Sequence, residues 1–275
     1  EVVANSSNYS NFNNPSKKKS PDYSDRKKIT TNKKYANAGF IVSDLVPVGT
    51  ITNLFENKLG TTGPDEIIVD IGKRQGIAKG DRFTVYNLDR YIYHPVLRVG
   101  MFEKLGEYMR RKGYEHKMMP YPGKPVGYRV MIQGVVEITE LGDEISSARV
   151  VKAYESIEAG YLLTPYKNYE DKTSMFSESD KSIEGYIVAS KGDKIGISTG
   201  DFIYIDKGWE DQVSPGDHFE VFRIPNSEEY IWYKLKTKKT PLLPNMRGEI
   251  KIIDTQKKTA TAIVVKSKID MVIGD

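Results

Sequence analysis

The sequence has no cysteine among its 275 residues and only three histidines. Without cysteine, the chain cannot form disulfide bonds, thiolate metal sites or a cysteine nucleophile. His94, His116 and His218 have no second histidine at ligand spacing, so a zinc or iron site would need distant carboxylates. We therefore expect each histidine to be a surface or turn residue, and we expect no metal ion and no cofactor.

Long hydrophobic runs are also missing from the sequence. No apolar stretch approaches the roughly 20 residues that a membrane-spanning helix needs, so we expect no transmembrane segment. The sequence also lacks a glycine-rich phosphate loop and a dinucleotide-binding fingerprint. The usual signals of a nucleotide-dependent enzyme are therefore not there.

The remaining arrangements for catalysis are weak. Ser24 and Lys27 have the spacing of a serine–lysine dyad, but they lie in a segment too polar to hold them in a fixed geometry. A glycosidase needs facing carboxylates in a cleft, whereas the two candidate pairs are expected in turns: Glu155 with Glu158, and Glu228 with Glu229. We predict no catalytic residues and no enzymatic activity, and keep a carbohydrate-active enzyme as the least favoured alternative.

The excess positive charge is confined to the N-terminus. Residues 1–36 carry eight Lys or Arg against three Asp or Glu, while the whole chain has a formal charge of +4. The rest of the chain is thus nearly neutral and offers no basic face for nucleic acid. Because residues 1–36 are also rich in Asn and Ser, we predict a disordered basic linker there.

One segment of the sequence occurs twice. Residues 72–86 recur as 208–222, with glycine, aspartate and apolar residues matched at a constant offset of 136. A second set of matches follows at an offset of 114: Gly134, Ala148, Val150 and Gly160 return as Gly248, Ala262, Val264 and Gly274. Two sets in the same order predict two copies of one fold, and their residue types point to structure rather than chemistry.

The matched regions have the pattern of short strands. Apolar and polar residues alternate over 67–71 and 82–85, which is typical of strands with one buried face. Glycine supplies a positive φ in tight turns, and aspartate can accept a hydrogen bond from the backbone, so two Gly-Asp pairs are predicted as structural turns: Gly80-Asp81 and Gly216-Asp217. We predict a mainly β protein of two duplicated small antiparallel β-barrel or sandwich modules.

The two predicted modules cover residues 37–166 and 183–275, with a polar linker at 167–182. The first module is 22 residues longer between its matched regions, and helical spacing of apolar residues predicts a short inserted helix near 97–113. After its last matched glycine the first module continues into another strand, 161–165, which the second module lacks. Two explanations are open: either the chain is cut before this strand, or a partner or another copy of the chain supplies the missing edge.

Aromatic residues supply the candidate binding surface. Tyr230 and Trp232 fall on one face of a predicted strand, beside Lys234, and Trp209 lies in the second repeat. Such residues could stack on sugar rings or bind a protein partner. The alternative is burial of both strand faces between packed sheets.

Several of these short motifs resemble a known group of proteins. They are Ala38-Gly39-Phe40-Ile41, Gly49-Thr50-Ile51, Gly80-Asp81-Arg82-Phe83, His94-Pro95 and Ile157-Glu158-Ala159-Gly160. Residues 36–275 resemble the non-catalytic C-terminal region of LysM-containing Gram-negative cell-envelope proteins, and are similar to the C-terminal domain of the bacterial flagellar assembly protein T. The resemblance implies a periplasmic or outer-surface scaffold of small β-barrels. No LysM module is visible, so peptidoglycan binding is carried over to no residue.

Together these features predict a non-enzymatic cell-envelope scaffold or binding protein, located in the periplasm or at the cell surface. Its expected partners are envelope proteins or peptidoglycan and other glycans, and nucleic acid is not expected. A different hypothesis is a subunit of a surface filament or flagellar basal structure, completed by strand exchange between copies.

Overall fold

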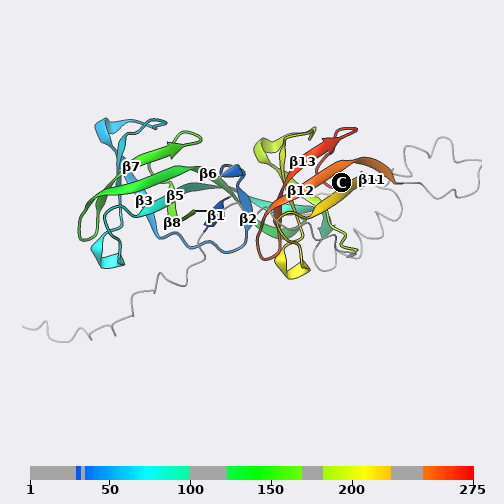
Figure 1. Cartoon of the computed structure of the whole chain (residues 1–275), viewed down its shortest axis with the longest axis horizontal. Helices are drawn as coiled ribbons and strands as arrows, with labels where there is room; N and C mark the ends of the chain where they lie inside the picture. Colours follow the sequence, from blue (N-terminus) through cyan, green and yellow to red (C-terminus); the bar gives the residue numbers. More distant parts are fainter. Residues whose placement is uncertain (1–28, 32–34, 99–122, 169–181, 224–243) are drawn as a thin grey trace, which may run out of the picture.

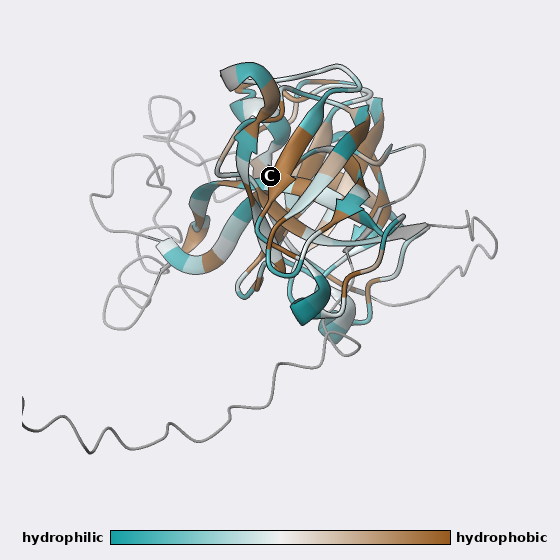
Figure 2. Ribbon diagram, turned by 90° about the vertical axis from the view of Figure 1, so that its left-hand side faces the viewer, coloured by the Kyte–Doolittle hydropathy of each residue, from teal (hydrophilic) through white to brown (hydrophobic). Residues whose placement is uncertain are grey.

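A computed structural model describes residues 29–31, 35–98, 123–168, 182–223 and 244–275 (Figure 1). The described chain is mainly β and forms two sheets, with short 3-10 turns between strands. Hydrophobic stretches lie along the strands, as Figure 2 shows, which is the pattern expected when one strand face is buried. Within these ranges, none of the helical segments has the length and hydropathy to cross a membrane.

The first sheet has a barrel-like form because six of its strands pair in a ring. Going round the ring, β3 pairs with β4, then β7, β6, β5 and β8, and β8 pairs again with β3. All six pairings are antiparallel, while β1 adds to β8 in parallel and β2 adds to β6. The strands are β1 (Ile29–Thr31), β2 (Phe40–Val42), β3 (Gly49–Leu54), β4 (Glu66–Val69), β5 (Arg82–Arg98), β6 (Gly123–Leu141), β7 (Ser146–Ala153) and β8 (Leu162–Asn168).

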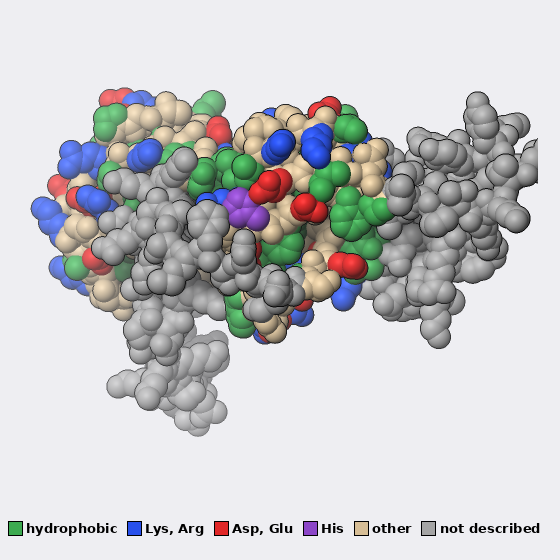
Figure 3. All heavy atoms as spheres, turned by 45° about the vertical axis from the view of Figure 1, so that its right-hand side comes forward, with side chains coloured by type: hydrophobic (Ala, Val, Ile, Leu, Met, Phe, Trp, Pro, Cys, Tyr) green, Lys and Arg blue, Asp and Glu red, His purple; other side chains and the backbone are tan. Residues whose placement is uncertain are grey.

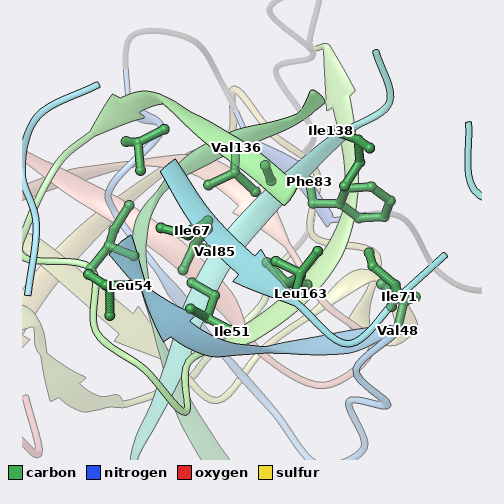
Figure 4. Packing of buried hydrophobic residues seen from close by; sticks show 14 residues of the cluster. Val48, Ile51, Leu54, Ile67, Ile71, Phe83, Val85, Val136, Ile138 and Leu163 are labelled. Atoms are coloured by element: carbon green, nitrogen blue, oxygen red, sulfur yellow. The ribbon is translucent and has the colours of Figure 1, made fainter. Parts of the chain in front are cut away.

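The interior of this ring is filled by aliphatic side chains. Ile51, Ile67, Val85 and Leu163 come from four different strands and have no exposed surface. They point toward one another in Figure 4, together with Phe83 and the other members of the cluster. This core accounts for the alternation that the sequence shows over these strands.

The second sheet is open and antiparallel, with the strand order β11-β12-β13-β10-β9. Its strands are β9 (Ile187–Ser190), β10 (Phe202–Ile205), β11 (His218–Arg223), β12 (Asn245–Thr255) and β13 (Ala260–Ser267). Its core includes Ile187, Ile203, Val221 and Ile252. Among the described strands, β9 and β11 are the two edges.

The two longest strands extend beyond the first ring. β5 and β6 remain paired as far as Arg98 and Gly123, and we call their distal part, residues 88–98 and 123–130, the arm. Figure 1 shows β6 and β2 between the two sheets, and the arm continues to the second sheet, where β5 lies against β9. The arm thus links the ring of the first sheet to the second sheet.

The Gly-Asp pairs form the predicted turns. Gly80 and Gly216 have φ values of +90° and +102°, which favour glycine. The carboxylate of Asp81 accepts the Ala78 N–H at 2.8 Å, and that of Asp217 accepts the Ser214 N–H at 2.9 Å. Both pairs are therefore structural.

The hydrogen bonds around these turns recur at the sequence offsets. Ile138 N–H donates to Asp81 O and Ile252 N–H to Asp217 O, both at 2.9 Å. A 3-10 turn precedes each pair, at Lys73–Gln75 and at Trp209–Asp211. We call residues equivalent when they are related by the offset of 136 up to β11, or by 114 from β12 onward.

Some predicted boundaries differ from the observed elements. Residues 97 and 98 of the expected inserted helix belong to strand β5, and the rest of 99–113 lies outside the described residues. Residues 29–31, which were expected in the N-terminal linker, form β1. The expected interdomain linker begins inside β8, which runs to Asn168, and 169–181 lie outside the described residues.

Candidate functional site

Segments far apart in the sequence meet at the junction between the two sheets. Its apolar centre is formed by Ile41, Ile92, Val188 and Tyr204, with Ala189 beside them. Ile41 comes from β2 and Ile92 from the arm, whereas the others lie on β9 and β10. The junction therefore buries the outer face of β9–β10 under the arm and β2.

A buried arginine lies at the edge of this apolar centre. Arg129, on β6, donates from Nε to Asp89 Oδ2 at 2.8 Å. Its Nη1 donates across the junction to Ser190 O at 2.8 Å and to Asp193 Oδ1 at 2.6 Å, and its Nη2 reaches Asp193 Oδ2 at 3.0 Å. Arg90 adds an exposed ion pair to Asp193. The planar guanidinium thus joins β5, β6 and the second sheet.

The charges at Arg129 stabilise one another. Burial alone would lower the pKa of Arg129, but the hydrogen bonds to Asp193 and Asp89 outweigh burial and raise the pKa. The hydrogen bond from Arg129 in turn lowers the pKa of Asp193. Both groups are ionised at neutral pH, so the contact is a charge-assisted one that would be costly to break.

The segment before β2 is held through its backbone carbonyls. Tyr204 Oη donates to Ala38 O at 2.7 Å, and Thr261 Oγ1 donates to Gly39 O at 2.9 Å. Gly39 has a φ of +73°, and a Cβ there would clash with the Val130 carbonyl. Glycine is therefore required at this point of the junction.

His94 forms a second polar contact across the junction. Its Nδ1 accepts the N–H groups of Val96 and Leu97, at 3.0 and 2.9 Å, so Nε2 carries the proton. Nε2 lies 3.1 Å from Asp206 Oδ2, and Asp206 Oδ1 accepts the Tyr186 N–H at 2.7 Å. His94 thus fixes the arm to the second sheet.

This position of His94 corrects the sequence-based expectation. The side chain is buried rather than placed at the surface or in a turn. The reason is that the arm extends beyond its own ring and packs against another sheet, which local sequence does not reveal. His218 does fit the expectation, since it lies partly exposed on β11 beside Glu249. His116 lies outside the described residues.

The other predicted site residues are not brought together. Tyr230, Trp232 and Lys234 lie outside the described residues, as do Glu228 and Glu229. Trp209 is 50% exposed in the 3-10 turn before β11.

The remaining candidate carboxylates, Glu155 and Glu158, are exposed in the turn between β7 and β8, as expected. Within the described ranges, no group of three His, Asp or Glu side chains has metal-binding geometry. On the side of the molecule seen in Figure 3, acidic and basic side chains are interspersed.

Sequence reasoning missed the residues of the junction. Arg129 interrupts an apolar stretch of β6, and a charged residue at such a position is a signal of a buried ion pair. Asp89 and Asp193 carry no comparable signal, since each has a charged residue beside it; Asp206 follows an apolar strand and matches Asp70 at the offset of 136, which indicates a structural role but not its contact with His94. Only the three-dimensional arrangement identifies them as partners.

Comparisons with known proteins add no family to this picture. No protein-family model matches the chain, and the search of curated proteins finds no significant match.

Proposed function

We propose that the protein is a non-enzymatic scaffold or binding protein of the cell envelope that acts through protein–protein or protein–glycan contacts. The observation that carries this proposal is the junction. Arg129 and His94 are both buried side chains that join the arm to the second sheet through hydrogen bonds, so the two sheets are held together. A fixed spacing between two β units suits a protein that positions partners rather than one that closes around a substrate.

We further propose that the two β units are copies of one module. The recurrence of equivalent hydrogen bonds supports this: Val150 N–H donates to Asp65 O at 3.0 Å, and the equivalent Val264 N–H donates to Asp201 O at 2.9 Å. Duplicated modules commonly supply repeated binding surfaces on one scaffold.

Partners and location follow from the sequence resemblance. We propose a periplasmic or cell-surface location, with envelope proteins or peptidoglycan as partners. The even mixture of charges in Figure 3 is consistent with a partner other than nucleic acid.

The test is association of the purified chain with isolated cell envelopes and with peptidoglycan, measured by sedimentation. We expect the wild type to co-sediment with one of them, and Arg129→Ala, which loosens the junction, to do so at least several-fold less. Arg90→Ala, which removes only the exposed ion pair, is the matched control. Release of glycan fragments that stops on Glu155→Gln would instead establish an enzyme.

One observation favours a second candidate function. The edges β9 and β11 of the second sheet are unpaired among the described strands, and open edges can mediate assembly. A subunit of a surface filament or flagellar basal structure would use this edge for strand exchange between copies. Light scattering at increasing concentration distinguishes the two, because a strict monomer argues against self-assembly.

A further inference from the structure

The hairpins β3–β4 and β9–β10 each carry a large aliphatic residue in the turn between their strands. We call these turns, residues 55–61 and 191–197, the tips. Leu59 in the first tip is 95% exposed, and the equivalent Ile195 in the second is 88% exposed. Among the described residues they are the two most exposed of the large hydrophobic side chains. One exposed aliphatic residue is common on a protein surface, but its return at the equivalent position of the other sheet indicates a shared role.

The lysine before each of these aliphatic residues is fixed at the base of its tip. Lys58 Nζ lies 3.2 Å from Asp65 Oδ2, and the equivalent Lys194 Nζ lies 2.5 Å from Asp201 Oδ1. The same ion pair therefore shapes both tips, and it places a long, partly exposed lysine side chain beside the aliphatic residue.

Backbone hydrogen bonds fix both tips where the chain returns to the core. Thr61 exchanges two bonds with Ile157, both at 2.8 Å, and the equivalent Ile197 exchanges two with Met271, at 2.9 and 3.0 Å. All four residues are buried, whereas the aliphatic residue two positions before Thr61 or Ile197 is exposed. Each tip thus projects from its sheet as a defined turn.

A second exposed aliphatic residue lies near each tip. Val151 is 48% exposed and the equivalent Val265 is 44% exposed, and each is followed by an exposed lysine, Lys152 or Lys266. The residue before each valine donates its N–H to the backbone of the aspartate that pairs with the tip lysine, at 3.0 and 2.9 Å. Each sheet therefore presents the same set near its tip: two exposed aliphatic residues and two lysines.

The two tips lie on the same side of the molecule. In Figure 1 the turn after β3, in blue, and the turn after β9, in yellow-green, are both at the upper edge. The 3-10 turns Lys73–Gln75 and Trp209–Asp211, in cyan and yellow, are both at the lower edge. Because the junction holds the two sheets together, one flat surface can touch both tips at once.

A lipid bilayer is the partner that best fits two separate tips. A stable protein interface buries a continuous area with an apolar centre, whereas these tips project from different sheets. A protruding aliphatic side chain can enter the boundary between headgroups and acyl chains, and this needs no preformed groove. The neighbouring lysines can keep their aliphatic stems in this layer and their ammonium groups among the phosphates.

Charge favours a bilayer that contains anionic lipid. Residues 1–36 carry eight Lys or Arg against three Asp or Glu, and basic segments are attracted to anionic headgroups. The tips themselves are of mixed charge, since Lys58 also lies 3.5 Å from Glu56. Insertion of the tips and attraction of the basic segment are thus separate contributions, and stable peripheral binding usually takes two.

We infer that the protein binds the surface of a lipid bilayer that contains anionic phospholipid, and that Leu59 and Ile195 insert into it together. The inference deepens the proposed cell-envelope function, and rests on it, by naming the surface on which the scaffold lies. Both sheets would then face the bilayer with the same side, and the turns at the opposite side would remain free for other partners.

The test is co-sedimentation of the whole chain with vesicles of phosphatidylcholine and about 30% phosphatidylglycerol. We expect saturable binding of the wild type. Leu59→Ser combined with Ile195→Ser should partition at least about tenfold more weakly, because each serine removes an apolar side chain from the bilayer. Equal partitioning of this double variant and the wild type, or no binding of the wild type, would overturn the inference.

Ile145→Ser is the matched control for the serine variants. Ile145 is 57% exposed, and its turn lies at the opposite side, where the N–H groups of Lys73 and Arg74 donate to the carbonyls of Gly142 and Asp143. This variant should bind within about twofold of the wild type, since its side chain faces away from the bilayer.

A second measurement locates the contact. Because the chain has no cysteine, Leu59→Cys, Ile195→Cys and Ile145→Cys each give a single site for an environment-sensitive nitrobenzoxadiazole label. Emission from the labels at 59 and 195 should rise at least about twofold when vesicles are added, while the label at 145 should not respond. An equal response at all three positions, or a response at none, would mean that the tips do not enter the bilayer.

Failure of this inference can be told apart from failure of the proposed function. If the wild type co-sediments with isolated envelopes but not with vesicles, only the membrane inference is wrong. If the double serine variant in addition loses envelope binding, the tips contact an envelope protein or glycan rather than lipid. If the wild type binds neither envelopes, peptidoglycan nor vesicles, the proposed function is wrong as well.

Discussion

The two sheets use equivalent strands in the same order but differ where β8 lies. In the first sheet β8 completes a ring, and Thr84 and Tyr86 of the neighbouring β5 are buried. In the second sheet the equivalent strand β11 remains an edge with exposed residues. Among the described residues, a single strand thus accounts for the difference between a closed ring and an open sheet.

The sheets also differ on the outer face of their first two strands. Thr52 on β3 is exposed and Ile68 on β4 is partly buried, whereas the equivalent Val188 and Tyr204 are buried at the junction. The difference follows from the arm, which covers only the second sheet. The outer face of these two strands is therefore more exposed in the first sheet and buried at the junction in the second.

The largest effect is expected when the closing strand loses its core residue. Leu163→Ala should lower the free energy of unfolding by about 3–5 kcal/mol, because it leaves a cavity at a fully buried position. Leu59→Ala, at a leucine that is 95% exposed, should change it by less than about 0.5 kcal/mol. Urea denaturation measures both. Similar values for the two variants would mean that β8 does not complete the core.

Loss of the buried arginine should have the next largest effect. Arg129→Ala removes the side chain that joins Asp89 to Asp193 and leaves Ser190 O without its donor, so we expect a loss of about 2–4 kcal/mol. Unfolding should also separate into two transitions, because the sheets no longer depend on each other. Arg90→Ala should cost less than about 1 kcal/mol, since its ion pair is exposed. One cooperative transition in Arg129→Ala would contradict a stabilising role for the junction.

These two predictions separate what sequence could and could not reveal. The strands and the Gly80-Asp81 turn follow from local pattern, because each depends on neighbouring residues. The junction depends on contacts between residues far apart in the chain, such as Arg129 with Asp193, 64 positions away, and Thr259 Oγ1 with Ile41 O, 218 positions away. No periodicity within a window of a few residues encodes such pairs.

The same reasoning explains the buried His94. Its neighbours Ile92, Val96 and Leu97 are apolar, but the contact with Asp206 joins residues 112 positions apart, and a helix was expected near 97–113. Residues 97 and 98 instead continue β5, because pairing with β6 and packing against β9 outweigh local helical preference. Tertiary contacts decided this element.

A smaller, pH-dependent difference is expected between Asp254 and the equivalent Glu140. Burial raises the pKa of Asp254 from 3.8 to about 7, whereas Glu140 is exposed. A raised pKa means that the folded state favours the protonated acid. The associated stability is therefore fully present below about pH 4 and is lost as the pH rises to about 7.

Asp254→Asn should remove this dependence. The full shift corresponds to roughly 4 kcal/mol, but Asp254 keeps some contact with solvent, so we expect the variant to gain on the order of 1–2 kcal/mol relative to the wild type between pH 4 and pH 8, measured by urea denaturation at each pH. Glu140→Gln should leave the change in the free energy of unfolding between pH 4 and pH 8 the same as in the wild type. If the stabilities of Asp254→Asn and the wild type change with pH in the same way, the pKa of Asp254 is not raised.

The smallest expected effect compares Tyr86 with the equivalent Phe222. Tyr86 is fully buried, and its hydroxyl has no hydrogen-bond partner in the described structure. An unpaired buried hydroxyl is destabilising, so Tyr86→Phe should raise the free energy of unfolding by up to about 1 kcal/mol. Tyr204→Phe should instead lower it by about 1–2 kcal/mol, because the Tyr204 hydroxyl donates to Ala38 O at 2.7 Å.

The sign of the stability change in Tyr86→Phe, compared with Tyr204→Phe, shows whether burial of the Tyr86 hydroxyl is destabilising. Phe222 at the open edge carries no hydroxyl to bury, while Tyr86 is buried in a cluster with Phe40, Val130 and Ile132, against which Leu162 of β8 also packs. Thermal denaturation of the two variants side by side measures the difference. If Tyr86→Phe lowers the melting temperature as Tyr204→Phe does, the Tyr86 hydroxyl has a partner, and its burial is not a cost of closing the ring.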